Sequence, residues 1–426
     1  MGSIQSQKIL KLNILKLNNG LESNDAILCY NAARVLKEFN DSHAMDILLN
    51  TLKDQNDERR AIAANTIGRL GNLKAVEPLI QILKNDPFNE ARQWAAQSLG
   101  WLKSVEAVES LIKALWADKD NKVRGEAAHA LGEIQDRKVI KPLIELLENH
   151  DEDISVQYNI VCTLGLFRDK QATEPLLILL ETDKNEDNFL KFGIFSALVH
   201  IRDEKAIGPL VKLLHNEDEE IREESAYALG QMGNGQAIEP LLNILRDITN
   251  NDCIRGIAAE ALGKLGSMEA LYFINEFLEQ DKGARDDTQR QKAALALINL
   301  GAAGIIKLID VLKASSNPYA ISSAIEALAI IGETRAIDPI LSFLNSNEDH
   351  IRRASATALG FYNDEAVVNP LTVALQDKDL WVRINALGSL ARLKKFEPIR
   401  TLVDENKADE KTREVALYLL DRSERT

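Results

Sequence analysis

The chain has 426 residues, of which 45% are hydrophobic and 27% charged, and it contains 10 prolines. This balance excludes a disordered chain, and no apolar stretch approaches the roughly 18 residues of a membrane span. The formal net charge of −14 argues against a nucleic-acid-binding surface. Three widely spaced cysteines and six histidines form no metal motif, which predicts a cytoplasmic protein with free thiols and no metal.

The predicted elements begin with apolar residues at helical spacing, which indicate an N-terminal capping helix over residues 1–20. Repeated segments follow over residues 24–405. A last amphipathic segment, residues 408–421, is expected to form a C-terminal capping helix. No linker or change of composition divides the chain, so we expect a single domain over 1–426.

The repeated segments share one register. A segment such as Val123 to Gly132 recurs at intervals of 31 to 35 residues, and an arginine lies eight residues before its last position in eight copies. Seven of the ten prolines lie ten residues after that position. Each unit therefore predicts two amphipathic helices, the first with proline near its start. Such short units bury their apolar faces only against each other, which predicts an all-α, right-handed α-solenoid of about twelve repeats.

The polar positions of each unit have predicted structural roles. We expect the recurrent arginine to form an Asp–Arg ladder between adjacent repeats. An aspartate between the two helices is expected to cap the second helix in several units. These aspartates are Asp57, Asp153, Asp218 and Asp349. The whole pattern resembles that of HEAT repeats, and this resemblance implies that the second helix of each repeat lines a concave groove.

Helical spacing separates the two sides of each second helix. In the fourth repeat we expect four apolar positions to be buried: Val123, Ala128, Leu131 and Ile134. The opposite, groove-facing side then carries Glu126, His129 and Glu133. The same offsets in the other repeats place large aromatic residues and two histidines in repeats three to seven. This concentration favours a site over a uniformly solvated scaffold.

The candidate site contains aromatic, cationic and titratable side chains. Its members are Arg34, Arg69, Trp94, Trp101, Glu126, His129, Asn159, His200, Glu224 and Tyr227. An apolar wall with a few convergent polar groups is typical of a site for a planar ligand or of a partner hot spot. The alternative is that Trp94 and Trp101 pack between repeats. Cys162 is disfavoured as a nucleophile, because no fixed base accompanies it in the sequence.

The first repeated helix, residues 30–39, has the sequence YNAARVLKEF. It resembles the Tyr-x-Ala-Ala-x-x-Leu-x-x-Phe helix that opens the E-type subunits of the phycobilisome lyase family, the E/F-type bilin lyases. The chain departs from that pattern at Arg34 and Val35, where paired tryptophans are often found. A tryptophan-bearing helix, Trp94 to Trp101, lies two repeats later. The length is similar to that of a lyase in which E-like and F-like halves form one chain.

The resemblance implies attachment of a linear tetrapyrrole, phycoerythrobilin or phycocyanobilin, to a cysteine of a phycobiliprotein α or β subunit. The nucleophilic thiol then belongs to the partner, and isomerisation stays open. The residues with implied catalytic roles are Glu126, His129, His200 and Tyr227. The residues with implied bilin-binding roles are Arg34, Arg69, Trp94, Trp101, Asn159 and Glu224. Within these sets, arginines would bind propionates, and the histidines or the tyrosine would relay a proton.

Other functions compete with this interpretation. A non-enzymatic scaffold would bind a protein partner in the same groove, with anchors spread along its length. A HEAT-type DNA glycosylase needs a basic groove, which a net charge of −14 disfavours. HEAT-type di-iron hydroxylases rely on His-Glu pairs, and the chain contains none.

Overall fold

The computed structural model describes residues 20, 25–38, 43–148, 152–182, 188–280, 287–405 and 408–424. The expected N-terminal capping helix lies outside these residues, apart from Gly20. Two compact units divide the chain, Met1–Pro209 and Leu210–Thr426. The expectation that residues 1–426 form one domain stays a prediction.

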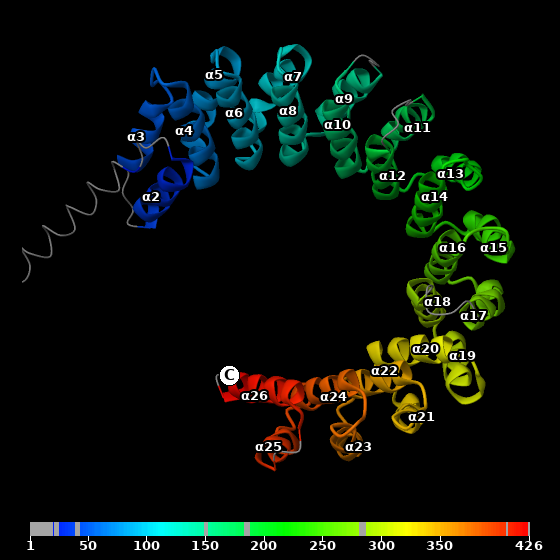
Figure 1. The fold of residues 1–426 in the computed structure, drawn as a ribbon. Helices are drawn as coiled ribbons and strands as arrows, with labels where there is room; N and C mark the ends of the chain where they lie inside the picture. Colours follow the sequence, from blue (N-terminus) through cyan, green and yellow to red (C-terminus); the bar gives the residue numbers. More distant parts are fainter. Residues whose placement is uncertain are drawn as a thin grey trace, which may run out of the picture. The chain divides into compact units, whose positions relative to one another are not determined.

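The first unit consists of antiparallel helix pairs that follow α2 (Figure 1). Its helices are α2 (Ala26–Glu38), α3 (His43–Thr51), α4 (Asp57–Leu70), α5 (Val76–Asn85), α6 (Asn89–Trp101), α7 (Val108–Ala117), α8 (Asn121–Ile134), α9 (Ile140–Leu147), α10 (Ile154–Phe167), α11 (Thr173–Thr182) and α12 (Phe189–Ile201). Helices α2, α4, α6, α8, α10 and α12 pack side by side as one layer. We call the solvent-accessible side of this layer the second-helix face.

The second unit continues the same pattern. Its helices are α14 (Glu219–Met232), α15 (Ile238–Arg246), α16 (Asp252–Lys264), α17 (Leu271–Glu279), α18 (Asp287–Asn299), α19 (Ala302–Ala314), α20 (Pro318–Ile330), α21 (Ile337–Phe343), α22 (Asp349–Leu359), α23 (Val368–Ala374), α24 (Leu380–Arg392), α25 (Glu397–Asp404) and α26 (Glu410–Glu424). Helix α13 (Ile207–Leu213) contains the boundary between the units. Throughout the described ranges the secondary structure is helical, with no strand, which confirms the all-α solenoid.

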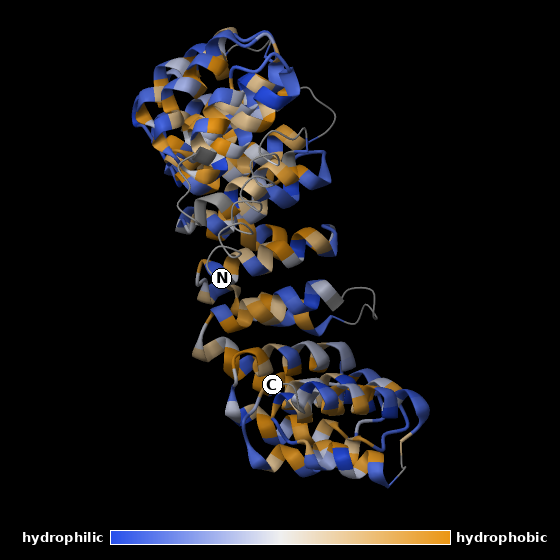
Figure 2. Ribbon diagram, turned by 90° about the vertical axis from the view of Figure 1, so that its left-hand side faces the viewer, coloured by the Kyte–Doolittle hydropathy of each residue, from blue (hydrophilic) through white to orange (hydrophobic). Residues whose placement is uncertain are grey.

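Two features of the repeat explain why the second helices pack so closely. Hydrophobic and hydrophilic residues alternate along the same helices (Figure 2), so each helix has an apolar side to bury. The recurrent glycine marks the point of closest approach. A β-carbon added at Gly100 would stand 2.8 Å from the Cα atom of Ala130 on the next second helix. In α8 the four predicted core positions, Val123, Ala128, Leu131 and Ile134, are all buried.

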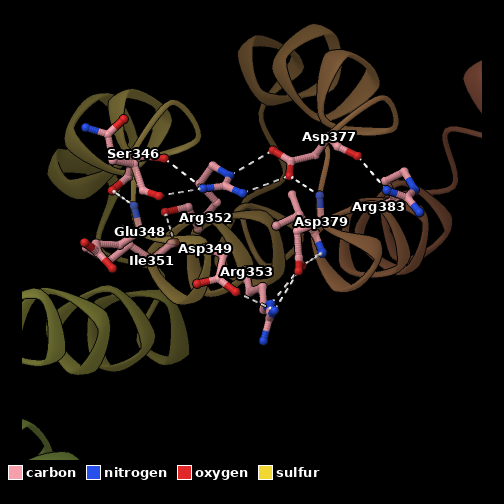
Figure 3. Close-up of polar contacts among 12 residues, drawn as sticks. Ser346, Glu348, Asp349, Ile351, Arg352, Arg353, Asp377, Asp379 and Arg383 are labelled. Carbon is pink, nitrogen blue, oxygen red and sulfur yellow. Dashed lines mark hydrogen bonds and ion pairs between the residues drawn. The ribbon is translucent and has the colours of Figure 1, made fainter. Parts of the chain in front are cut away.

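The recurrent arginine forms the expected ladder between adjacent repeats in part of the series. In the first unit Arg92 donates from Nε to Asp118 at 2.7 Å and from Nη1 to the carbonyl oxygen of Asp86 at 2.9 Å. In the second unit Arg352 makes the equivalent bonds to Asp377 and to the carbonyl oxygen of Ser346, both at 2.9 Å (Figure 3). Because each guanidinium binds both a carboxylate and a carbonyl oxygen of a loop between helices, the ladder joins adjacent repeats through buried polar contacts.

The predicted helix caps are correct in part. Asp153 and Asp218 cap α10 and α14 by accepting from backbone N–H groups of the first turn. Asp57 and Asp349 do not cap, because each is already the first residue of its helix. The cap of α4 is Asn56, one residue earlier. The two displaced aspartates instead accept from an arginine of their own helix, in each case at 2.6 Å.

Candidate functional site

The second-helix face of the first unit holds one arginine between two aromatic rings. Arg69, on α4, is exposed, and its Cζ atom lies 5.5 Å from the ring centre of Tyr30 and 5.4 Å from that of Trp101. Cation–π contacts of this kind hold a guanidinium in place without neutralising its charge. Among the described residues Arg69 has no carboxylate partner, whereas the ladder arginines are paired. This side chain can therefore attract an anion beside an aromatic wall.

The two tryptophans of α6 are both half-buried, so neither is enclosed between repeats. Their seven-residue spacing places them two turns apart on one side of the helix. Between them, the side-chain amide of Gln97 donates to Glu126 of α8 at 3.4 Å. Glu126 is half-buried and His129, one turn further along α8, is exposed. Arg69, the two tryptophans and Glu126 therefore lie on three neighbouring helices of one layer, α4, α6 and α8.

Asn159 and Cys162, on α10, are less available to a ligand. The Asn159 amide donates to the carbonyl oxygen of Ser155 at 2.8 Å, so one of its hydrogens is used within its own helix. Cys162 is half-buried and hydrogen-bonded to Tyr158, and burial raises the pKa of its thiol. A thiol with a raised pKa is a poor nucleophile near neutral pH, in line with the expectation for Cys162.

Two further candidates of the first unit are exposed. Arg34 lies on α2, one turn from Tyr30. His200 lies on α12, where its Nδ1 atom is 2.7 Å from the carbonyl oxygen of Ser196. In the neutral imidazole this contact requires a proton on Nδ1 and leaves Nε2 as an acceptor. His200 can therefore accept a proton from a bound molecule through Nε2.

Glu224 and Tyr227 belong to the second unit, where both lie on α14. Glu224 is half-buried, and burial, followed by the charges of Glu223 and Glu220, raises the pKa of its carboxyl group. The ring of exposed Tyr227 lies 5.4 Å from Nζ of Lys264. A carboxyl group with a raised pKa exchanges protons closer to neutral pH than an ordinary glutamate.

Two features escaped prediction from the sequence. Tyr30 lies one residue before the position that was expected to face the groove in its helix, so its contact with Arg69 was not anticipated. The second unit also contains a cavity of about 580 Å³ between α20, α22 and α24. Tyr319 and His350 form one wall of it, with ring centres 5.0 Å apart. The sequence gives little indication of this ring pair. Both residues lie in the first turns of their helices and not at the positions expected to face the groove.

The described residues contain no group of three or more histidine, cysteine, aspartate or glutamate side chains arranged to hold a metal ion. None of the helices described is long and apolar enough to cross a membrane.

A family model for HEAT repeats matches nine overlapping segments of the chain, between residues 14 and 421. The matched segments are 14–100, 76–155, 108–189, 140–230, 191–253, 209–298, 281–359, 305–391 and 337–421. The chain therefore belongs to the HEAT-repeat proteins. Solved structures agree with this fold. Kap95p has a TM-score of 0.53 at 14% identity and matches 96% of this chain and 60% of its own. Importin beta has a TM-score of 0.51 at 13% identity, over 96% of this chain and 61% of its own.

Curated relatives fall into two groups. The phycocyanobilin lyase subunit alpha of Picosynechococcus sp. is 29% identical over 213 residues, 47% of this chain and 68% of that protein. The phycocyanin operon protein Z of Pseudanabaena tenuis is 26% identical over 37% of this chain and 80% of its own length. The deoxyhypusine hydroxylase of Schizosaccharomyces pombe is 35% identical over 107 residues, 24% of this chain. This chain spans only about a third of the hydroxylase, 34% of its length.

Proposed function

We propose that this chain is a phycobilin lyase, which attaches a linear tetrapyrrole to a cysteine of a phycobiliprotein subunit. The observation that carries the proposal is the position of Arg69, an unneutralised cation held between Tyr30 and Trp101. A linear tetrapyrrole combines a flat conjugated body with two propionates, and this arrangement offers a surface to each. Similarity to a phycocyanobilin lyase subunit over 68% of that protein supports the same function.

The proposed roles follow from the position of each side chain. Arg69 and exposed Arg34 bind the propionates, because guanidinium–carboxylate hydrogen bonds are strong and directional. Trp94 and Trp101 provide the wall against which the tetrapyrrole packs. Glu126 accepts from pyrrole N–H groups on the same face. Asn159 contributes its remaining amide hydrogen bonds.

In the proposed reaction the thiol belongs to the phycobiliprotein subunit. It adds across the ethylidene double bond of the tetrapyrrole: a sulfur–carbon bond forms, the carbon–carbon π bond breaks, and the thiol proton ends on the tetrapyrrole. His129 or His200, both on the first unit, relays this proton. The main contribution of the lyase is then to hold the tetrapyrrole and the subunit in register. Whether the tetrapyrrole is phycoerythrobilin or phycocyanobilin is decided by the assay below.

A protein-binding scaffold is the second candidate. It is favoured by exposed apolar side chains in the second unit, where Ile330 is 63% and Phe361 50% exposed. An adaptor spreads such anchors along its length, whereas a lyase concentrates them around one ligand. Fold similarity to Kap95p does not decide between the two, since it concerns architecture alone.

Co-expression tests the proposal directly. The chain is produced together with the enzymes that make phycoerythrobilin or phycocyanobilin and with a panel of phycobiliprotein α and β subunits. Denaturing gels read by zinc-enhanced fluorescence then reveal covalent colour. We expect one subunit to become coloured only when the chain is present, and less colour with Arg69→Gln or Trp101→Ala. Arg168→Gln, which changes an exposed arginine at the end of α10, is the matched control. No coloured subunit across the panel would favour the scaffold.

A further inference from the structure

The cavity of the second unit has the size and lining of a small-molecule site. Its volume of about 580 Å³ lies within the range of ligand pockets, roughly 300–1,000 Å³. One wall is a stacked ring pair, Tyr319 and His350, whose planes differ by 16°. The rest of the lining includes the apolar side chains of Ile330 and Phe361 and the carboxylate of Glu326, which accepts a hydrogen bond of 2.8 Å from a side-chain amide outside the cavity. A flat wall opposite apolar side chains suits a planar, conjugated molecule.

The polar groups of the cavity differ in how far they are already satisfied. The guanidinium of Arg353 donates from Nη2 to Asp349 and to Asp379, each at 2.6 Å, and from Nε to Asp379 at 2.8 Å (Figure 3). Its charge is therefore compensated. The Nε2 atom of His350 is buried and has no hydrogen-bond partner in the structure. The imidazole therefore contributes its ring to the wall of the cavity and offers no accessible hydrogen-bonding atom at Nε2.

An uncompensated cation lies at the edge of the cavity. The Cζ atom of Arg392, at the end of α24, is 4.3 Å from the ring centre of Phe361. Within the described ranges Arg392 forms no ion pair, unlike Arg353 and the ladder arginines. Arg392 also lines a neighbouring hollow between α24 and α26, together with Lys394 and Arg422. In a chain of net charge −14, this local concentration of positive charge favours an anionic ligand.

From these contacts we propose that the cavity binds a planar, conjugated organic carboxylate. Its flat part lies against the Tyr319–His350 ring pair and Phe361. The carboxylate reaches the rim and pairs with Arg392, with Lys394 as the second cation. Every contributing residue lies in the second unit, and none of them has a role in the proposed lyase reaction.

Two probes with the same planar body and different terminal groups, one a carboxylate and one an alcohol, test the site. Both 1-pyrenebutyrate and 1-pyrenebutanol carry a planar aromatic body on a short chain, but only the butyrate is an anion. We expect the full-length chain to bind the butyrate at least tenfold more tightly than the butanol, as a charge-assisted hydrogen bond predicts. Arg392→Gln should abolish most of that preference. Arg400→Gln, which changes an exposed arginine of α25, should retain it.

A second measurement locates the bound probe. In a sample with labelled isoleucine methyl groups, the Ile330 signal, assigned with Ile330→Val, should shift on addition of the butyrate. The signal of Ile62, half-buried on α4 in the first unit, should not follow the same titration. Phe361→Ala should weaken both probes by about the same factor. Equal affinity of the two probes for the unmodified chain, or an unmoved Ile330 signal, would overturn the proposal.

Discussion

Replacing Arg92 by alanine removes a well-enclosed member of the arginine ladder. Its side chain is 6% exposed and that of Asp118 8% exposed, and the two are joined by hydrogen bonds of 2.7 and 2.8 Å. Asp118 is then left as a carboxylate beside a vacated space. The carbonyl oxygens of Asp86 and Pro87 also lose the donor that lies 2.9 and 3.2 Å away. Arg92→Ala is therefore expected to destabilise more than a surface substitution.

The expected size of this effect follows from burial. Breaking a buried ion pair by removing one partner costs about 3–5 kcal/mol. For a unit of this length, each kcal/mol lowers Tm by about 2–4 °C, so Arg92→Ala should lower it by roughly 6–20 °C. The control is Arg137→Ala. Arg137 pairs with Asp169, but its side chain is 66% exposed, and the loss should stay below about 1 kcal/mol.

Thermal melts followed by circular dichroism measure both variants, and hydrogen exchange locates the change. Because each repeat contacts only its neighbours, the added exchange should concentrate in α6 to α8. The variant Arg92→Met/Asp118→Leu should recover much of the loss, since it removes both charges together. If Arg92→Ala and Arg137→Ala melted at the same temperature as the unmodified chain, the ladder would not be a buried stabilising feature.

Three further changes test other parts of the structure. Hydrogen bonds from Arg353 lower the pKa of Asp379 to about 2, so the folded state favours its ionised form. The resulting stability is complete above the unfolded pKa of roughly 3.9 and is lost as the pH falls toward 2. Asp379→Asn should therefore lose less stability than the unmodified chain in melts from pH 5 to pH 2, by up to about 1 kcal/mol because the pair is partly exposed. Gly100→Ala should destabilise by about 1–3 kcal/mol in chemical denaturation, since its β-carbon meets α8, whereas Gly388→Ala, with open space around it, should not. His129→Ala should change the free energy of unfolding by no more than about 0.5 kcal/mol and slow bilin attachment, and a parallel loss of stability and attachment would indicate a structural role.

The fold was predictable because the repeat combines several independent signals in one register. Glycine at position 100 reports a close helix approach, and arginine eight residues earlier reports the ladder. Each has a physical reason in the contact that it makes with the neighbouring repeat. Helix caps were less predictable, since an aspartate at the cap position and one at the first helical position differ by a single residue. This explains the error at Asp57, where Asn56 takes the capping role.

For the candidate site, the sequence predicts which residues share one side of a helix, but not which residues of different helices are in contact. The spacing of Trp94 and Trp101 indicates that they share one side of α6, and both side chains remain accessible there. Contacts between different helices depend on side-chain conformations and on the offset between repeats. The contact of Arg69 with Tyr30 and the stacking of Tyr319 on His350 are of this kind.

The origin of the thiol provides the most direct test of the proposed function. A variant in which all three cysteines are replaced by serine, Cys29→Ser/Cys162→Ser/Cys253→Ser, is co-expressed with the bilin-synthesis enzymes and the acceptor subunit. The intact masses of both proteins are then measured. The proposal predicts one bilin on the acceptor subunit, at a yield close to that of the unmodified lyase, and none when the lyase is omitted. A folded triple variant that leaves the acceptor uncoloured, or a bilin found covalently on the unmodified lyase itself, would contradict the proposal that the partner supplies the nucleophile.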